Sequence, residues 1–416
     1  MRNQQADTQS IRNLGATEQL FWLIDRNRPI HFALVAQIDR VFAPRAWDAA
    51  LSAVQQRHPL LRARILANAD GAVAFYHDAD ARIPLRLVDD AQGSLWQSEV
   101  RREMATPVGG SSAPLVRATV LQGEGISTIV LTAHHALLDG MGGAYVMEDL
   151  LRALSGNALE RLPLVQPLEN LLGAQMKTAT VSGEMSPAPE PKAFRAAQGA
   201  RAEVATLALG AQLTQAVIER SRKERTTVHG AIAAAVHEAG RRLSQAWCAR
   251  PIRTVTPIDL RKTVDGVGKA NGVYIAQTIT IDDRERGAPF WHAARDVKAL
   301  IAPAQTGESV ARETKALDAF MASNPSVDDA AGFLSHMLAF DVLLSNLGSE
   351  PIAASTYEGF ALKALWGPFV SSGFADDQVI GVCTLGGVMR LAHTSYDAMP
   401  GLLEEVRAVL SEAVAA

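Results

Sequence analysis

An apolar strand joined directly to a polar, titratable segment is the most informative feature of this sequence. The run from Gly125 to Ala133 is β-branched and apolar, a pattern typical of a buried strand. It leads into HHALLDG, in which His134 and His135 precede Asp139 and Gly140. The end of a buried strand is a place where a fold positions chemistry rather than packing. A histidine there can exchange a proton near neutral pH.

Other interpretations of HHALLDG have to be weighed against catalysis. A histidine pair is often structural or lies on the surface, and the Asp139-Gly140 pair is a common turn signal. A histidine and Asp139 could also bind a metal ion, but zinc would need a third protein ligand. The sequence offers no HExxH or CxxC motif to supply one, so no metal is expected. The complete spacing at a strand end favours the catalytic interpretation.

Size and composition narrow the class of protein. The chain has 416 residues, 48% of them hydrophobic, which exceeds the usual single domain and predicts two. A formal net charge of −4 gives no electrostatic footprint for nucleic acid. Two distant cysteines argue against a disulfide framework and favour a cytoplasmic protein. Neither a secretory signal nor an apolar run of about 18 residues is present, so no membrane span is expected.

The pattern along the chain predicts two structured halves. Residues 1–13 are expected to be disordered, and residues 14–172 form a first subdomain that carries HHALLDG. Residues 173–200 read as an exposed crossover linker, because proline occupies positions 187, 189 and 191. Residues 201–416 form the second subdomain. Both halves mix strands and helices with short loops, which predicts an α/β fold of two sandwiches with mixed sheets rather than one doubly wound sheet.

Apolar periodicity places the individual elements. Strands are expected at 32–38, 60–65, 72–76, 115–121, 126–133, 202–207, 252–257, 273–281, 340–344, 361–366, 378–384 and 388–393. Helices are expected at 44–56, 94–105, 144–154, 210–222, after Thr226-Thr227, and at 289–300, 309–320 and 399–414.

Besides HHALLDG, several other segments of the sequence resemble one known group of proteins. They are GATEQLFW (15–22), HPLLRARI (58–65), PLVRATVL (114–121), TPIDLR (256–261) and SNLG (345–348). HHALLDG resembles the HHxxxDG signature of the thioester-dependent acyltransferase superfamily. The other segments resemble further motifs of that superfamily, and they occur in the same order along the chain. That group includes chloramphenicol acetyltransferase, plant BAHD acyltransferases, condensation domains of nonribosomal peptide synthetases, and mycobacterial polyketide-associated acyltransferases. The resemblance covers most of the chain, and the chain length fits the mycobacterial proteins best.

One departure separates the chain from the plant branch. The plant enzymes carry a DFGWG segment, whereas this chain has LWGPF at 365–369 and GFADD at 373–377. It also lacks a carrier-protein or adenylation domain, so it resembles a free-standing enzyme. The resemblance implies two chloramphenicol acetyltransferase-like subdomains with an active-site tunnel between them.

The resemblance also implies a reaction. An acyl group would move from a thioester, either acyl-coenzyme A or an acyl or peptidyl carrier protein, to a hydroxyl or amine acceptor in natural-product or lipid biosynthesis. No tightly bound cofactor is expected; the coenzyme A or phosphopantetheine thioester is a co-substrate. Two alternatives stay open: a free-standing condensation enzyme that forms an amide or ester from carrier-bound substrates, and a non-catalytic protein that binds a carrier protein.

Roles carry over by position within the motif. His135 would be the general base that deprotonates the acceptor, and His134 would shape the loop. Asp139 would form an ion pair that holds this loop, with Arg261 as its expected partner. Gly140 would leave room beside the reacting carbon, either through a positive φ or through close approach.

Two weaker sites complete the expectations. Ser345 and Asn346 of SNLG would lie opposite His135, where a donor could steady an oxyanion or line the tunnel. Arg220, Arg222, Lys223 and Arg225 form the densest basic group and could receive the phosphates of the donor. A solvated helix end explains the same four residues equally well.

Overall fold

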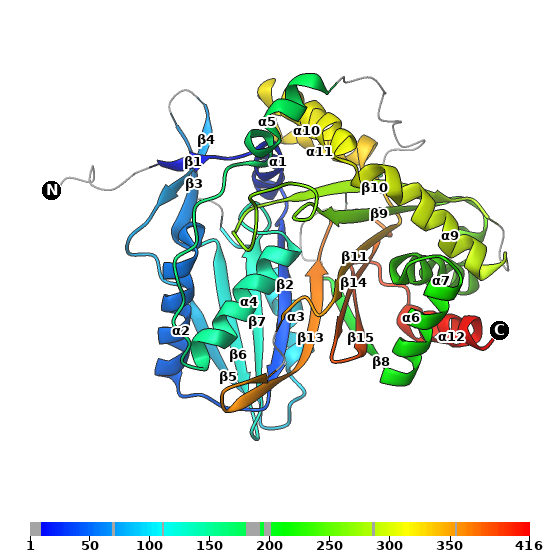
Figure 1. Ribbon diagram of the computed structural model, residues 1–416, viewed down its shortest axis with the longest axis horizontal. Coiled ribbons are helices and arrows are strands. Elements are labelled where there is room, and N and C mark those ends of the chain that lie inside the picture. Colours follow the sequence, from blue (N-terminus) through cyan, green and yellow to red (C-terminus); the bar gives the residue numbers. More distant parts are fainter. Residues whose placement is uncertain are drawn as a thin grey trace.

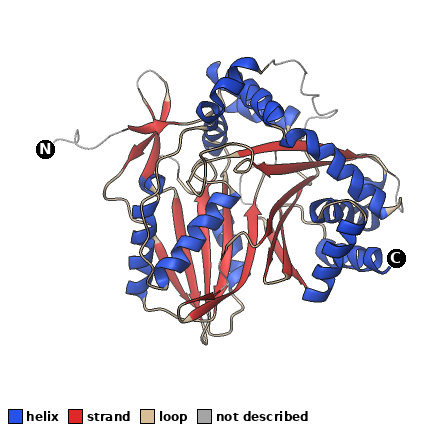
Figure 2. Ribbon diagram, in the orientation of Figure 1, coloured by secondary structure: helices blue, strands red, loops and turns tan. Residues whose placement is uncertain are grey.

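A computed structural model describes residues 10–68, 71–109, 112–179, 192–194, 201–284, 288–353 and 356–416. Two six-stranded sheets lie side by side, and a three-stranded sheet flanks the first of them (Figure 1, Figure 2). Each large sheet contains parallel and antiparallel pairs and has its own hydrophobic core. The α/β fold of two sandwiches with mixed sheets, predicted from the sequence, is therefore confirmed.

The first large sheet has the strand order β12-β13-β2-β7-β6-β5. Its strands are β12 (Thr356–Tyr357), β13 (Phe360–Val370), β2 (His31–Ile38), β7 (Ser127–His134), β6 (Val116–Gln122) and β5 (Leu85–Asp89). Helices α2 (Pro44–Arg57) and α4 (Gly140–Leu154) cover one face, and α3 (Trp96–Ala105) covers the other. Because both faces are covered, every residue of β7 is buried, which explains its uninterrupted apolar sequence.

The second large sheet has the strand order β10-β9-β11-β14-β15-β8. Its strands are β10 (Ile275–Asp282), β9 (Ile252–Asp259), β11 (Val342–Ser349), β14 (Gln378–Leu385), β15 (Val388–Ser395) and β8 (Glu203–Leu209). A layer of helices packs on this sheet: α6 (Ala211–Lys223), α7 (Val228–Leu243), α9 (Phe290–Ile301) and α12 (Leu402–Ala415). The alanine-rich buried face of α7 lets α9 and α12 pack closely against it.

A group of helices spans the junction between the halves. Helix α1 (Ala16–Asp25) of the first half packs against α10 (Gly307–Ala322) and α11 (Val327–Met337) of the second half. Their shared apolar cluster includes Leu20 and Leu317. Helix α5 (Leu168–Thr178), which is kinked at Gly173, packs on α10 (Figure 1). The two halves therefore meet in a packed interface that these helices form.

Two strands cross from the second half of the sequence into the first sheet. Strand β13 pairs antiparallel with β2, so β12 and β13 belong to the first sheet although residues 201–416 were assigned to the second subdomain. At the crossing β13 approaches β14 so closely that a Cβ on Gly381 would collide with the carbonyl oxygen of Pro368. Apolar periodicity indicates a strand here but not which sheet receives it.

Other elements differ from the sequence-based expectations. Ser10–Asn13 forms β1 and pairs with β4 (Val73–His77), so order begins before residue 14. The predicted strand at 60–65 is a 3₁₀ turn at Pro59–Arg62 followed by β3 (Ala63–Ala67). The apolar periodicity also did not indicate β5, α5 or α11.

The predicted linker lies mostly outside the described residues, which include only residues 173–179 and 192–194 of it. Residues 173–179 continue α5 and its cap. Phe194 bridges to Phe374, and the backbone N–H of Lys192 donates to the carbonyl of Ser335. Among the described residues, no helix combines the length and apolar character that a membrane crossing requires.

Candidate active site

HHALLDG forms the turn between β7 and α4. Strand β7 ends at His134, and α4 begins at Gly140. Asp139 is the N-cap of α4: its Oδ1 accepts a hydrogen bond of 2.7 Å from the backbone N–H of Gly142. Aspartate suits this position because its side chain satisfies a helix N–H that has no partner within the helix. The motif therefore encodes a strand end, a tight turn and a helix start.

His134 is fully buried, and its contacts do not suit a catalytic base. Its Nδ1 accepts a hydrogen bond of 3.0 Å from the backbone N–H of Ala136, so this nitrogen is not free to accept a proton from a substrate. Nε2 lies 3.3 Å from Oδ2 of Asp25 at the end of α1. This separation is an ion-pair distance, and Nε2 has no hydrogen-bond partner among the described residues. His134 therefore packs the turn against the end of α1.

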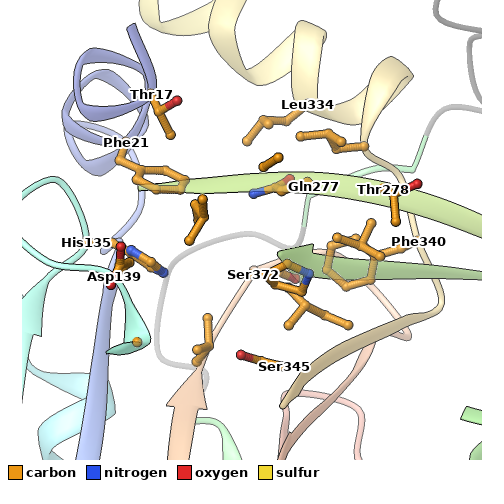
Figure 3. A pocket seen from close by; sticks show the side chains of 18 of the residues that line it. Thr17, Phe21, His135, Asp139, Gln277, Thr278, Leu334, Phe340, Ser345 and Ser372 are labelled. Carbon is orange, nitrogen blue, oxygen red and sulfur yellow. The ribbon is translucent and has the colours of Figure 1, made fainter. Parts of the chain in front are cut away.

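His135 presents its ring to the space between the halves (Figure 3). Phe21 of α1 and Phe32 of β2 flank the imidazole, with ring centroids 4.6 Å and 5.1 Å away. The backbone N–H of His135 donates to the carbonyl of Ile30 at 2.9 Å, which fixes the main chain. Nδ1 is buried and has no hydrogen-bond partner among the described residues.

Burial lowers the pKa of the His135 imidazole, although its own backbone carbonyl and the Asp139 carboxylate favour the protonated form. The ring is therefore neutral at pH 7 and available to accept a proton.

Asp139 is completely buried and uses both oxygens. While Oδ1 caps α4, Oδ2 accepts from Nη1 of Arg261 at 2.9 Å and from the backbone N–H of Tyr274 at 2.9 Å. Arg261 follows β9, so the carboxylate of the first half is held by the second. The side chain of Asp139 has no oxygen left for a substrate.

Arg261 is enclosed on several sides. Its Nη1 also donates to Oδ1 of Asp259 at 2.7 Å, and its guanidinium lies over the rings of Tyr145 and Tyr274 at 5.6 Å and 5.5 Å. Burial alone would lower the pKa of Arg261, but the two carboxylates outweigh burial and raise it. The guanidinium is permanently charged and ties the turn of HHALLDG to the second sheet.

The metal-site alternative does not fit the donor atoms. His134 and Asp139 direct their polar atoms to Asp25, Arg261 and backbone groups instead of to a common point. Among the described residues, no group of three or more His, Cys, Asp or Glu side chains is arranged around such a point.

Position 140 favours glycine because neighbouring side chains approach its Cα closely. Its φ is not in the left-handed region, but a Cβ added here would lie 3.0 Å from Cδ2 of Leu347 on β11. Pro368 of β13 lies 4.0 Å away on the same side. A larger residue would narrow the cavity beside His135.

A cavity of about 510 Å³ runs between the halves and is mainly apolar. Its walls come from α1, β2, the HHALLDG turn, β9, β10, α10, α11, β11 and residues 368–374. Figure 3 shows His135 at one side of this space and Phe340, Thr278 and Ser345 across it. A volume of this size holds a small organic substrate, and an imidazole at the wall can act on it.

Ser345 and Asn346 line the same cavity from β11. Asn346 accepts a hydrogen bond of 2.8 Å at Oδ1 from the backbone N–H of Gly348, which leaves its amide N–H₂ group as a donor. Figure 3 places Ser345 across the cavity from His135. Both residues therefore lie on the wall that the sequence assigned to them.

The predicted basic group lies elsewhere. Arg220, Arg222, Lys223 and Arg225 are at the end of α6 and are not part of the cavity wall. Arg220 pairs with Glu224 at 3.0 Å and lies over the ring of Trp291. The solvated helix end is the interpretation that this geometry favours.

The sequence did not single out several polar residues of the wall: Thr17, Arg253, Gln277, Glu313 and Ser372. They come from four separate elements and the loop after β13, and no local motif joins them. One signal was available, because Gln277 and Thr278 are adjacent polar residues in β10, where the rest of the strand alternates apolar and polar residues.

The chain resembles known proteins over its whole length. Residues 198–353 match the family described as phthiocerol/phthiodiolone dimycocerosyl transferase C-terminus. The structure aligns with polyketide synthase associated protein 5 from Mycobacterium tuberculosis at a TM-score of 0.70 and 19% identity, covering 99% of both chains. It aligns with the first condensation domain of the CDA synthetase at a TM-score of 0.73 and 16% identity, covering 98% and 97%.

One of the linear gramicidin synthase proteins of Brevibacillus parabrevis is 28% identical over 147 residues, which are 33% of this chain and 2% of that protein. The fold of the chain is therefore that of condensation domains and of the mycobacterial polyketide synthase associated protein. It spans only a small part of its gramicidin synthase relatives, whose matching region is a fragment of a much longer protein. A shared fold does not fix the reaction, so the chemistry has to be argued from the site.

Proposed function

We propose that this protein is an acyltransferase that moves an acyl group from a thioester to a hydroxyl or amine acceptor. The donor would be an acyl-coenzyme A or an acyl carrier protein, in polyketide or nonribosomal peptide biosynthesis or a related pathway. The observation that carries the proposal is the position of His135: a neutral imidazole on the wall of a cavity between two halves. The match to a transferase family and to gramicidin synthase supports the same class of reaction.

His135 would act as the general base. With Nδ1 buried, Nε2 would be the nitrogen that takes the proton from the acceptor. The acceptor oxygen or nitrogen forms a bond to the thioester carbonyl carbon, and the carbonyl π electrons move to its oxygen. Collapse of this intermediate breaks the carbon–sulfur bond, and the leaving thiolate recovers the proton from the imidazolium. All atoms and charges balance without a covalent enzyme intermediate.

Three other groups would support this step. The Asp139–Arg261 ion pair holds the turn that carries His135, and His134 fixes it against Asp25. The Asn346 amide, or the Ser345 hydroxyl, would donate to the oxyanion. Water is kept out by the apolar walls around them.

Replacement of His135 tests the proposal. His135→Ala should lower the rate of thiol release from a generic acyl thioester in the presence of alcohols or amines by about 10²- to 10⁴-fold. Thermal unfolding and thioester binding should stay close to those of the wild type. Normal turnover in His135→Ala would rule out this mechanism. No turnover with any donor, together with tight binding of a carrier protein, would favour a non-catalytic binding protein instead.

A further inference from the structure

Three residues with carboxylate side chains line the cavity, and one of them differs from the other two in its ion pairing. Asp139 and Asp259 are both bound by Arg261. Glu313 of α10 also lines the cavity, yet no described cation lies within 4.0 Å of its carboxylate. Arg253, which also lines the cavity, donates its Nε to the carbonyl of Ala339 and forms no described ion pair with Glu313. A carboxylate in a mainly apolar cavity usually has a cationic partner.

The local contacts of Glu313 hold the side chain but do not neutralise it. Oε1 accepts a hydrogen bond of 3.0 Å from the hydroxyl of Ser309, which in turn accepts one of 2.9 Å from Nη2 of Arg312. Among the described residues, Oε2 has no hydrogen-bond partner. Burial raises the pKa of the Glu313 carboxyl despite Ser309 and Arg312. One oxygen is thus anchored and the other is available to a ligand.

Glu313 belongs to the wall of the same chamber as His135. Leu317, one turn further along α10, packs in one cluster with Leu20 of α1. The next residue of α1, Phe21, contacts the ring of His135. Glu313, Leu317, Leu20 and Phe21 all line the cavity, as His135 does, so Glu313 and the base belong to one continuous space.

We propose that Glu313 selects an acceptor that carries an ammonium group at a distance from its nucleophilic atom. This inference rests on the proposed acyl transfer. The ammonium would occupy the position of the missing counter-ion and donate to the free oxygen of Glu313. An acceptor without a cation would leave the carboxylate unpaired in the cavity, and such a loss discriminates more strongly than a change in apolar contact.

Binding tests the inference without any turnover. Hexylammonium and 1-hexanol have the same chain and differ in the terminal group, so isothermal titration calorimetry at pH 7.5 compares them directly. We expect the wild type to bind hexylammonium at least about tenfold more tightly, and Glu313→Gln to lose that preference. Glu308→Gln is the matched control, because Glu308 lies on the same helix and is exposed outside the cavity. It should leave the preference intact.

Kinetics provide the second measurement. With hexanoyl-N-acetylcysteamine as donor, kcat/KM for 5-amino-1-pentanol should exceed that for 1-hexanol, with ester and amide products both counted as released thiol. Glu313→Gln should lower kcat/KM about tenfold for the amino alcohol and leave 1-hexanol unchanged.

Equal wild-type binding of hexylammonium and 1-hexanol, or equal losses for both acceptors in Glu313→Gln, would overturn the selection. Absence of all turnover alongside a Glu313-dependent preference in binding would reject the acyl transfer and keep the cation site.

Discussion

Oδ2 of Asp139 lies 2.9 Å from Nη1 of Arg261, and this contact joins the loop after β7 to the end of β9. Both side chains are nearly inaccessible, with 0% and 5% of their surfaces exposed. The pair therefore sets the position of the His135 turn relative to the second half. Its removal should affect activity through geometry, because neither side chain is needed to contact a substrate.

Arg261→Ala should lower both stability and activity. It leaves the Asp139 carboxylate buried without its cation, which costs about 3–5 kcal/mol in the free energy of unfolding. Asp259→Asn removes the more exposed partner of Arg261 and should cost less than about 1 kcal/mol. Urea denaturation of both variants measures the contrast. Equal effects of the two changes would contradict the central role of the Asp139 contact.

The acid limb of kcat/KM should lie below pH 6.5. Burial lowers the pKa of His135, so the free enzyme keeps its base neutral at a lower pH than an exposed histidine would. Rate measurements between pH 4.5 and 8.5 with a neutral alcohol as acceptor locate this limb. A midpoint clearly above 6.5 would show that a different group, or a charged His135, controls the step.

Gly140→Ala should reduce turnover by about tenfold or more, because misplacement near the reacting atoms is costly. The new methyl group would lie 3.0 Å from Cδ2 of Leu347 and would push into the space beside His135. Leu347→Ala removes the opposing atom, so the double variant should recover part of the loss. If the double variant is as slow as Gly140→Ala, the contact with Leu347 is not the cause.

Regular elements were predictable from the sequence because their apolar periodicity is local. The strand before HHALLDG and the amphipathic α2 and α12 illustrate this. The Asp139–Arg261 contact was anticipated only through the resemblance of the two segments to known proteins. The loop between Arg261 and Tyr274 carries no periodic signal, since turns and a positive φ at Gly272 shape it.

The residues of the cavity wall were harder to predict from the sequence than the HHALLDG motif. Glu313 sits among ordinary helix residues in the sequence, and only the packing of α10 against α1 brings it to the chamber of His135. The same limit applies to β13, which reads as a strand of the second half but pairs with β2. Contacts between distant segments decide both cases, and a single sequence does not record them.

Acidification from pH 7.5 to pH 5 should destabilise the fold through buried neutral histidines. Burial lowers the pKa of His393 to about 4, and burial together with Arg117 lowers that of His31 to about 4. The unfolded chain takes up these protons near pH 6.5 but the folded protein does not. Stability is therefore full above pH 6.5 and is lost as the pH falls toward 4, by about 2 kcal/mol per histidine at pH 5.

His393→Gln isolates one of these contributions. Glutamine can still hydrogen-bond to Gln378, which contacts Nε2 of His393 at 2.9 Å, but it does not titrate. The difference in unfolding free energy between pH 7.5 and pH 5 should shrink by about 2 kcal/mol in this variant. His336→Gln, at an exposed position of α11, serves as the control and should leave the difference unchanged. An unchanged pH dependence in His393→Gln would mean that the buried ring is protonated in the folded protein.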